Sequence, residues 1–185
     1  MNLDVFQMQQ CENQGRLFES LDRRPIDAKT FIKAFMHSRA AAGLDSTFDH
    51  FQWAGIEYIY EDVVEEFNLQ PDSNPLRYNT EALWYGGYIT RYWHYLTSET
   101  MKQIYAQCDE NLLLQCYGFH SEANEMAIED IKAIARNKEN PRERKQKKRQ
   151  SWHSPRWRLE RHSPRRKGRR RRRCSRTSRT RSSTM

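Results

Sequence analysis

The chain has 185 residues and a formal net charge of +8, but its charges are divided between two segments of opposite sign. Residues 1–135 contain 10 Lys and Arg against 21 Asp and Glu, a net charge of −11, whereas residues 136–185 contain 22 against 3, a net charge of +19. The first segment is long enough to bury a core without metal or disulfide bonds, and the second has too few bulky apolar residues to offset its ordering entropy. We predict an acidic folded domain followed by a basic, disordered Arg/Ser-rich tail, which excludes a uniformly globular protein.

Composition excludes several further classes of protein. No apolar run approaches the roughly 20 residues of a membrane-spanning helix, and the first ten residues lack the charged start and apolar stretch of a secretory signal. The four cysteines form no CxxC pair, which predicts reduced thiols rather than a disulfide framework or a zinc ribbon. We expect a cytoplasmic protein with no membrane interaction, no metal and no cofactor.

The N-terminal half of the acidic segment shows helical periodicity. A first helix is predicted over about residues 4–21. A second begins with Asp27 as its N-cap and ends at Gly43. A third, over about residues 46–67, combines an apolar face with a strongly acidic outer face.

A connection at residues 69–79 leads to a densely aromatic helix at residues 81–96, for which Asn79 is a suitable N-cap. Within this helix, the small side chains of Gly86 and Gly87 predict close approach of a neighbouring backbone rather than a phosphate-binding loop.

Further helical spacing follows the aromatic helix. Thr97 or Ser98 is the expected cap of the next helix, a break is expected at Gly118, and a last helix is predicted over about residues 122–136. The fold class predicted from these elements is all-α, a compact bundle of about five to seven helices around residues 81–96.

The aromatic helix and its surroundings contain the residues best suited to a site. Helical spacing places Tyr88, Arg91 and Tyr95 on one face, and a buried Arg91 needs a carboxylate, for which Glu57 or Glu61 is expected. One interpretation is a pocket with an arginine anion anchor and a histidine acid/base. The favoured alternative is that Arg91 clamps two helices and the aromatic residues pack in the core. The candidate pocket comprises Tyr88, Arg91, Tyr92, His94, His120 and Glu57, with no catalytic role assigned to any of them.

Cys108, Cys116 and His120 are the candidate ligands for a metal site, because Cys116 and His120 are four residues apart. Gly118 between them argues against a shared helical face, and the cysteine spacing matches no zinc pattern. We therefore expect no metal here. Phosphate-binding glycine loops and the common hydrolase motifs are also absent from the sequence.

Three stretches carry a resemblance: WAGIEYIYEDVVEE (53–66), ALWYGGYITRYWHYLTSETMKQIY (82–105) and GFHSEANEMAI (118–128). In order and spacing they resemble a set of small helical bacterial cytoplasmic proteins, met beside toxin–antitoxin style genes, over about residues 45–134. The resemblance implies a compact helical domain that acts as an antitoxin or operon partner, and it supplies no established activity. The positions that match its signature are Tyr88, Arg91, Tyr92, Trp93, His94 and His120.

The basic tail at residues 136–185 predicts an electrostatic, non-specific nucleic-acid-binding arm. Its Lys and Arg side chains would displace counterions from phosphates, and its tryptophans would stack on unpaired bases, which favours RNA slightly over duplex DNA. The candidate contact residues are Lys147, Lys148, Arg149, Trp152, Trp157, Arg165, Arg166, Lys167, Arg169, Arg170, Arg171, Arg172 and Arg173.

Other interpretations of the tail remain open. Opposite charges of this size would allow it to fold back on its own domain or to drive self-association. A shifted reading frame would also produce an abrupt change to Arg/Ser-rich sequence where the resemblance ends. Polyarginine further serves as a targeting or membrane-surface patch, although no amphipathic helix accompanies it here.

Three functions follow from these patterns. The leading hypothesis is a non-enzymatic bacterial protein-binding module, antitoxin-like, whose acidic domain engages a basic partner such as a toxin while the tail contacts nucleic acid. The second is a small enzyme or ligand-binding domain that uses the Arg/His/Tyr pocket. The third is a self-assembling structural protein that packages nucleic acid through its arginine-rich end.

Overall fold

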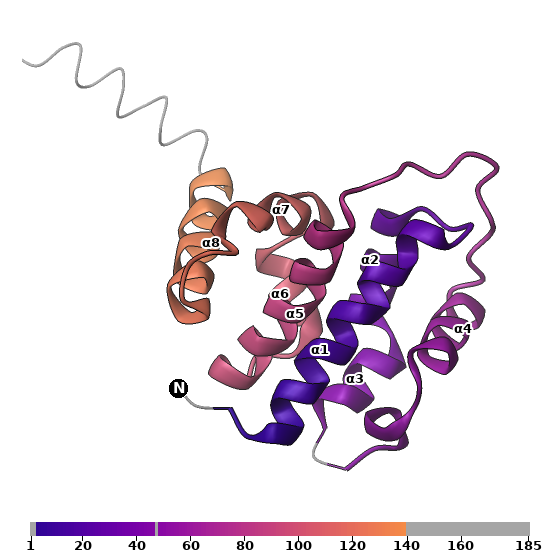
Figure 1. Cartoon of the computed structure of the whole chain (residues 1–185), viewed down its shortest axis with the longest axis horizontal. Helices are drawn as coiled ribbons and strands as arrows, with labels where there is room; N and C mark the ends of the chain where they lie inside the picture. Colours follow the sequence, from indigo (N-terminus) through magenta and orange to yellow (C-terminus); the bar gives the residue numbers. More distant parts are fainter. Residues whose placement is uncertain (1–2, 47, 140–185) are drawn as a thin grey trace, which may run out of the picture. The chain divides into compact units, whose positions relative to one another are not determined.

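The computed structural model describes residues 3–46 and 48–139, and these residues form an all-α domain without a β-strand (Figure 1). The predicted fold class is therefore confirmed. The α-helices are α1 (Val5–Ser20), α2 (Ala28–His37), α3 (Arg39–Asp45), α4 (Ile56–Glu66), α5 (Thr80–Thr97), α6 (Met101–Gln107), α7 (Glu110–Gln115) and α8 (Asn124–Glu139). Short 3-10 helices are η1 (Leu21–Arg23), η2 (His50–Trp53) and η3 (Cys116–Phe119).

The helices with a clear capping residue begin where the sequence predicts. Asp4 accepts a hydrogen bond from the backbone N–H of Gln7 at 2.7 Å and completes a capping box at the start of α1. Asp27 caps α2, and the side chain of Asn79 accepts from the backbone N–H of Glu81 at 2.9 Å at the start of α5. Local side-chain chemistry thus fixes these N-termini.

The second and third predicted helices are each interrupted. Ser38 has an extended backbone and accepts a hydrogen bond from the N–H of Ala41 at 3.0 Å, so it ends α2 and caps α3. The expected stop at Gly43 is wrong, because this residue lies inside α3. Residues 46–67 are not continuous either, since Ala54 and Gly55 are extended between η2 and α4.

Later boundaries also differ in detail from the predictions. Ser98 adopts a left-handed backbone with φ of 60° and terminates α5, so Thr100 rather than Thr97 or Ser98 caps α6. The last helix begins at Asn124, two residues later than expected. With these breaks, the described residues contain eight α-helices.

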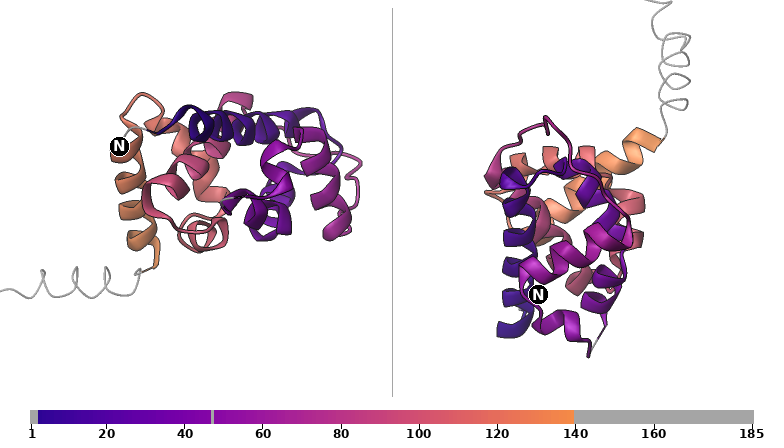
Figure 2. Two further views of the ribbon diagram at one scale, coloured as in Figure 1. Left: turned by 90° about the horizontal axis from the view of Figure 1, so that it is seen from below. Right: turned by 90° about the vertical axis from the view of Figure 1, so that its right-hand side faces the viewer.

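Helices α1 and α5 make the most extensive helix contact of the domain. Helices α4 and α8 lie at its opposite ends in Figure 1 and in the left view of Figure 2. A Cβ atom on Gly87 would overlap the carbonyl group of Gln14 and lie 2.9 Å from the Cα of Gly15. The predicted close approach of a backbone is therefore confirmed at Gly87, where the absence of a side chain lets the two helices touch.

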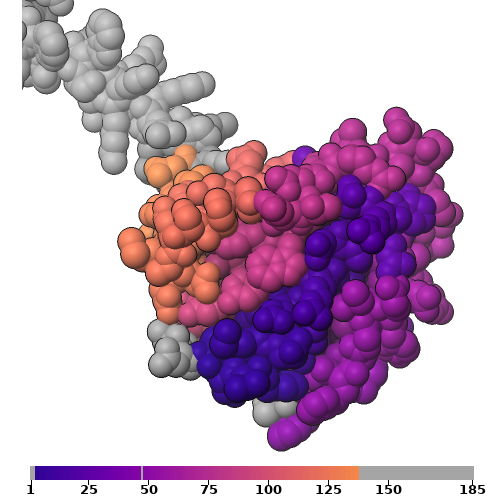
Figure 3. Space-filling view, viewed as in Figure 1, coloured from indigo at the N-terminus to yellow at the C-terminus, as the bar shows by residue number. Residues whose placement is uncertain are grey.

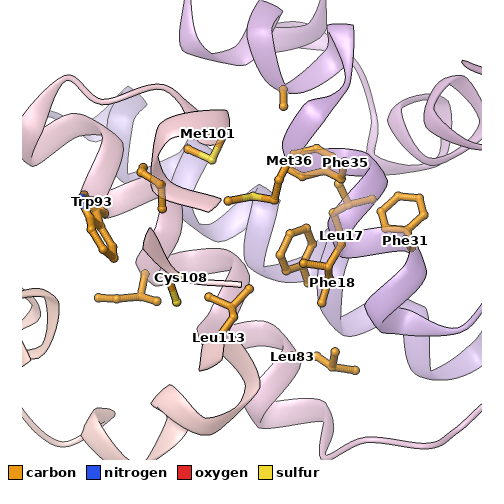
Figure 4. Packing of buried hydrophobic residues seen from close by; sticks show 14 of the residues in the cluster. Leu17, Phe18, Phe31, Phe35, Met36, Leu83, Trp93, Met101, Cys108 and Leu113 are labelled. Carbon is orange, nitrogen blue, oxygen red and sulfur yellow. The ribbon is translucent and has the colours of Figure 1, made fainter. Parts of the chain in front are cut away.

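Buried apolar side chains converge from both halves of the described domain, and they include Phe18, Phe35 and Trp93 (Figure 4). The members of this hydrophobic cluster lie between Cys11 and Ala135. Residues 3–139 thus contain a core of their own. None of the described helices is long and apolar enough to cross a membrane. The predicted disordered tail begins at residue 136, but residues 136–139 form the end of α8, so this boundary is wrong. The rest of the predicted tail, from residue 140 onward, lies outside the described residues.

Candidate functional site

The structure does not bring the six candidate pocket residues together. Arg91 and His94 lie in one polar cluster between α3, α5 and α6, whereas Tyr88 and Tyr92 belong to an aromatic row elsewhere on α5. The remaining two, His120 directly after η3 and Glu57 on α4, have separate partners.

Arg91 is the centre of the polar cluster, and its side chain is only 1% exposed. Its Nη1 donates a hydrogen bond to Asp45 Oδ1 at 2.7 Å, and its Nε donates to Gln14 Oε1 at 2.9 Å. The need for a carboxylate partner is confirmed, but the expectation of Glu57 or Glu61 is wrong. Both of those residues lie on the exposed face of α4, whereas Asp45 ends α3 directly against α5.

Asp45 and Gln14 extend this cluster across four helices. The second carboxylate oxygen of Asp45 accepts a hydrogen bond from the backbone N–H of Met101 at 2.8 Å. Gln14 Nε2 donates to Thr90 Oγ1 at 2.9 Å and to the carbonyl oxygen of Gly87 at 3.1 Å. The cluster therefore joins α1, α3, α5 and α6, and within the described part of the chain only Nη2 of Arg91 has no hydrogen-bond partner there. This is the helix-clamping role that the sequence analysis favoured for Arg91.

His94 borders the cluster, and its surroundings disfavour the charged form of its ring. Its Nδ1 lies 2.8 Å from the carbonyl oxygen of Glu99 and 3.6 Å from Asp45 Oδ1. Burial and the positive charge of Arg91 lower the pKa of His94, and these effects outweigh the opposing effect of Asp45. Since a carbonyl can only accept, Nδ1 carries the hydrogen of the neutral ring.

A pocket of about 250 Å³ is bordered by α2, α3 and α6, and Asp45 is one of its lining residues. Its lining includes Met36, His37, Thr100 and Lys102 but not Arg91 or His94. Because both oxygens of Asp45 are already bound within the protein, the pocket offers no free carboxylate from this residue to a ligand.

The tyrosines of the candidate pocket form a row of rings along α5. Trp84 and Tyr88 stack with centroids 5.0 Å apart, and Tyr88 and Tyr92 follow at 6.3 Å. Tyr92 also donates a hydrogen bond from its hydroxyl to Glu125 Oε1 on α8 at 2.8 Å. In Figure 3 a strip of α5 lies between α1 and the C-terminal helices. The row therefore runs along α5 and is joined to α8 through Tyr92.

His120 and Glu57 lie apart from both groups. His120 is exposed, stacks on Tyr117 at 4.5 Å and places its Nδ1 2.8 Å from the carbonyl oxygen of the same residue. Glu57 is exposed and forms an ion pair with Arg24.

The described cysteines are buried and act as packing groups. Burial raises the pKa of the Cys11 thiol to about 12, which keeps it protonated and unreactive. Cys116 donates from Sγ to the carbonyl oxygen of Leu112 at 3.0 Å, so its thiol points along its own helix rather than towards His120. Among residues 3–46 and 48–139 there is no group of three or more His, Cys, Asp or Glu placed to hold a metal ion.

Two features escaped the sequence analysis. Asp45 and Gln14 contact Arg91 from positions 46 and 77 residues away, and no local pattern indicates such contacts. The other feature is a set of exposed aromatic side chains near η2, where Phe48 is 92% and Trp53 78% exposed. Both residues lie inside the helix predicted over about residues 46–67, so the helical pattern gave no signal that they would be exposed. The thirteen predicted nucleic-acid contact residues lie outside the described residues.

Comparison with known proteins identifies no relative, so the assignment of a function rests on the geometry of the structure. No protein-family model matches the chain, and neither the curated proteins nor the solved structures contain a match.

Proposed function

We propose that the acidic helical domain is a non-enzymatic protein-binding module that engages a basic protein, in the manner of an antitoxin that neutralises a toxin. In this proposal, residues 136–185 add an electrostatic, non-specific contact to nucleic acid. The observation that carries it is the division of charge, −11 over residues 1–135 and +19 over residues 136–185. Opposite potentials of this size steer and select partners of complementary charge.

The surface of α4 supports a basic partner for the domain. Glu57, Glu61, Glu65 and Glu66 are all exposed on this helix. In the part of the chain that the structure describes, Glu61 and Glu65 form no ion pair, so their charge remains available at the surface. Exposed carboxylates at one edge attract basic groups without the desolvation cost that a buried site would impose.

The burial of Arg91 and its bonds to Asp45 and Gln14 favour a protein-binding function over the binding or conversion of a small molecule. A pocket that used Arg91 as an anion anchor would need its guanidinium to face a ligand, but this group is 1% exposed and bound to Asp45 and Gln14. His94 contributes its Nδ1 to a backbone carbonyl. Arg91 and His94 therefore support the fold, and we infer that the domain interacts with its partner through its exposed surface.

A binding experiment tests the protein-binding part of the proposal. The tagged full chain is used to capture partners from its native host, and each captured protein is then identified, purified and titrated calorimetrically at 50 and 300 mM salt. We expect a partner with a basic isoelectric point whose affinity falls at the higher salt concentration. A monomer that captures no basic protein, or a partner whose affinity is independent of salt, would contradict the proposal.

The nucleic-acid part has its own test. Binding of a single-stranded RNA oligonucleotide is compared between the full chain and residues 1–135 over a salt series. If six to ten phosphates are neutralised, affinity should fall by about 10³- to 10⁵-fold between 50 and 200 mM salt. The shorter chain should lose nearly all binding. Equal binding by both chains would place the nucleic-acid contact elsewhere.

A further inference from the structure

Aromatic side chains are exposed on α1, η2 and α4. The rings of Phe6 and Trp53 lie with their centroids 5.3 Å apart, and Trp53 is 78% exposed. The segment that carries Trp53 is held against α1, because Gln10 Nε2 donates a hydrogen bond to the carbonyl oxygen of Gln52 at 2.9 Å. Trp53 is thus presented to solvent on an anchored backbone.

The geometry of η2 extends this set of side chains to α4. Side chains three residues apart eclipse one another in a 3-10 helix, so His50 and Trp53 share a face. The ring of His50 lies 6.3 Å from that of Tyr58, whose side chain is itself 51% exposed. We call Phe6, His50, Trp53 and Tyr58 the aromatic edge.

Carboxylates continue the aromatic edge along α4. Tyr58, Glu61 and Glu65 are spaced by three and four residues, so they follow one another on one side of the helix. All three are exposed. Trp and Tyr are the residue types enriched at the energetic centres of protein interfaces, which distinguishes this edge from an acidic surface alone.

The same helix already shows what this combination binds. Arg24 forms an ion pair with exposed Glu57 while its guanidinium carbon lies 4.4 Å from the ring centroid of buried Tyr60. Glu57 and Tyr60 are three residues apart, and Tyr58 and Glu61 repeat this spacing on the exposed side. A guanidinium can stack on an aromatic face and pair with a carboxylate at once, which an ammonium group does less well.

We propose that the aromatic edge, with Glu61 and Glu65, is the docking surface for an arginine-rich segment of a partner protein. This inference rests on the proposed function and specifies the partner chemistry: guanidinium groups stack on Trp53 and Tyr58 and pair with the neighbouring carboxylates. Complementary charge selects a basic segment, and the exposed rings select arginine over lysine.

The test uses the chain ending at Pro141, which retains the hydrophobic core between Cys11 and Ala135. Labelled nona-arginine and nona-lysine peptides are titrated by fluorescence anisotropy against this chain and its variants. We expect nona-arginine to bind more tightly than nona-lysine. Trp53→Ala should weaken nona-arginine binding about fivefold, the loss expected for one solvent-exposed cation–π contact, and should reduce the preference for arginine.

A charge-matched pair of variants separates a local surface from general attraction. Glu61→Gln with Glu65→Gln removes two charges beside the aromatic edge, whereas Glu129→Gln with Asp130→Asn removes two exposed charges from α8. We expect a larger loss from the α4 pair. Equal losses from both pairs, or unchanged binding in Trp53→Ala with its circular dichroism and melting temperature preserved, would overturn the docking surface.

A second comparison distinguishes this inference from the proposed function. The basic partner captured from the host is titrated against Trp53→Ala in the full chain. Loss of affinity supports the docking surface. Unchanged affinity would overturn the docking surface but leave the protein-binding function intact, whereas failure to capture any basic partner would count against the function itself.

Discussion

An arginine side chain pairs with a carboxylate in the buried cluster around Arg91. We propose the same pairing, with an arginine of a partner, at the exposed aromatic edge around Trp53. Arg91 is 1% exposed and its charge is satisfied by Asp45 inside the domain, whereas Trp53 is 78% exposed. The residues that suggest a site most strongly in the sequence are therefore committed to joining helices. The exposed groups that we propose meet another molecule lie on α1, η2 and α4.

This difference has an energetic basis. A buried ion pair adds little net stability relative to apolar packing, but loss of one partner strands the other charge away from water. An exposed aromatic ring has the opposite property, because its removal costs the fold little while it can dominate an interface. Substitutions in the two regions should therefore separate stability from binding.

The largest expected effect comes from Asp45→Asn, which removes the charge that balances buried Arg91. We expect the free energy of unfolding to fall by about 3–5 kcal/mol, measured by urea denaturation. Glu12→Gln is the control, because Glu12 and its partner Arg16 have side chains that are 43% and 58% exposed, and this loss should stay below about 1 kcal/mol. Similar losses from both substitutions would contradict a special role for the buried pair.

A smaller loss is expected where α1 meets α5 beneath the same cluster. Gly87→Val should reduce the free energy of unfolding by about 1–3 kcal/mol or more, because its side chain would overlap the backbone of Gln14. Gly118→Ala provides the control, since a Cβ at this position meets no atom within 4 Å. Urea denaturation of Gly87→Val that matches the control would show that the helices can separate freely.

Glu99 lies at the edge of the polar cluster, where its carbonyl oxygen is next to His94. The pH dependence of stability tests the contribution of its carboxylate. Burial acts to raise its pKa, but hydrogen bonds from Gln107, Trp93 and Thr97 outweigh this and lower the pKa below its ordinary value of 4.5. The ionised form therefore stabilises the fold above pH 4.5, and this contribution is lost as pH falls through the lowered pKa.

Glu99→Gln should accordingly cost about 1–2 kcal/mol at neutral pH, because a neutral amide replaces a charged acceptor. The difference between wild type and variant should shrink progressively below pH 4.5. Thermal denaturation over a pH series measures it. A constant difference down to strongly acidic pH would show that the charge of Glu99 contributes nothing.

The smallest effect on stability is expected at the aromatic edge. Trp53→Ala should change the free energy of unfolding by no more than about 0.5 kcal/mol, because the ring is mostly exposed. Trp93→Ala, at a ring that is 0% exposed, should cost about 3–5 kcal/mol. If urea denaturation gave a large loss for Trp53→Ala, the aromatic edge would be part of the core rather than a surface for binding.

Sequence reasoning succeeded where the signal is local. The N-caps Asp27 and Asn79 and the close approach at Gly87 follow from the chemistry of single residues and their immediate neighbours. It failed at Ser38, where a side-chain hydrogen bond to Ala41 competes with a continuous helix. Whether such a serine caps or continues a helix depends on the packing around it.

The candidate site shows the same limit more strongly. The cost of burying a charge indicated that Arg91 needs a carboxylate partner. That this partner is Asp45 depends on the tertiary contact between α3 and α5, because the two residues are 46 positions apart in the sequence. Exposure is a property of the whole fold, so the sequence could not distinguish exposed Trp53 from buried Trp93. Residue type and spacing therefore indicated the chemistry at Arg91, and tertiary contacts determined its role.

Hydrogen exchange with bound peptide tests the contrast between the two regions most directly. The chain ending at Pro141 is exchanged into deuterium with and without saturating nona-arginine, and peptic fragments are compared. We expect added protection in fragments that cover η2 and the first turns of α4, with no change around Arg91 and His94 in α5. Protection confined to α5, or spread evenly over the domain, would contradict the separation of a structural polar cluster from a binding edge.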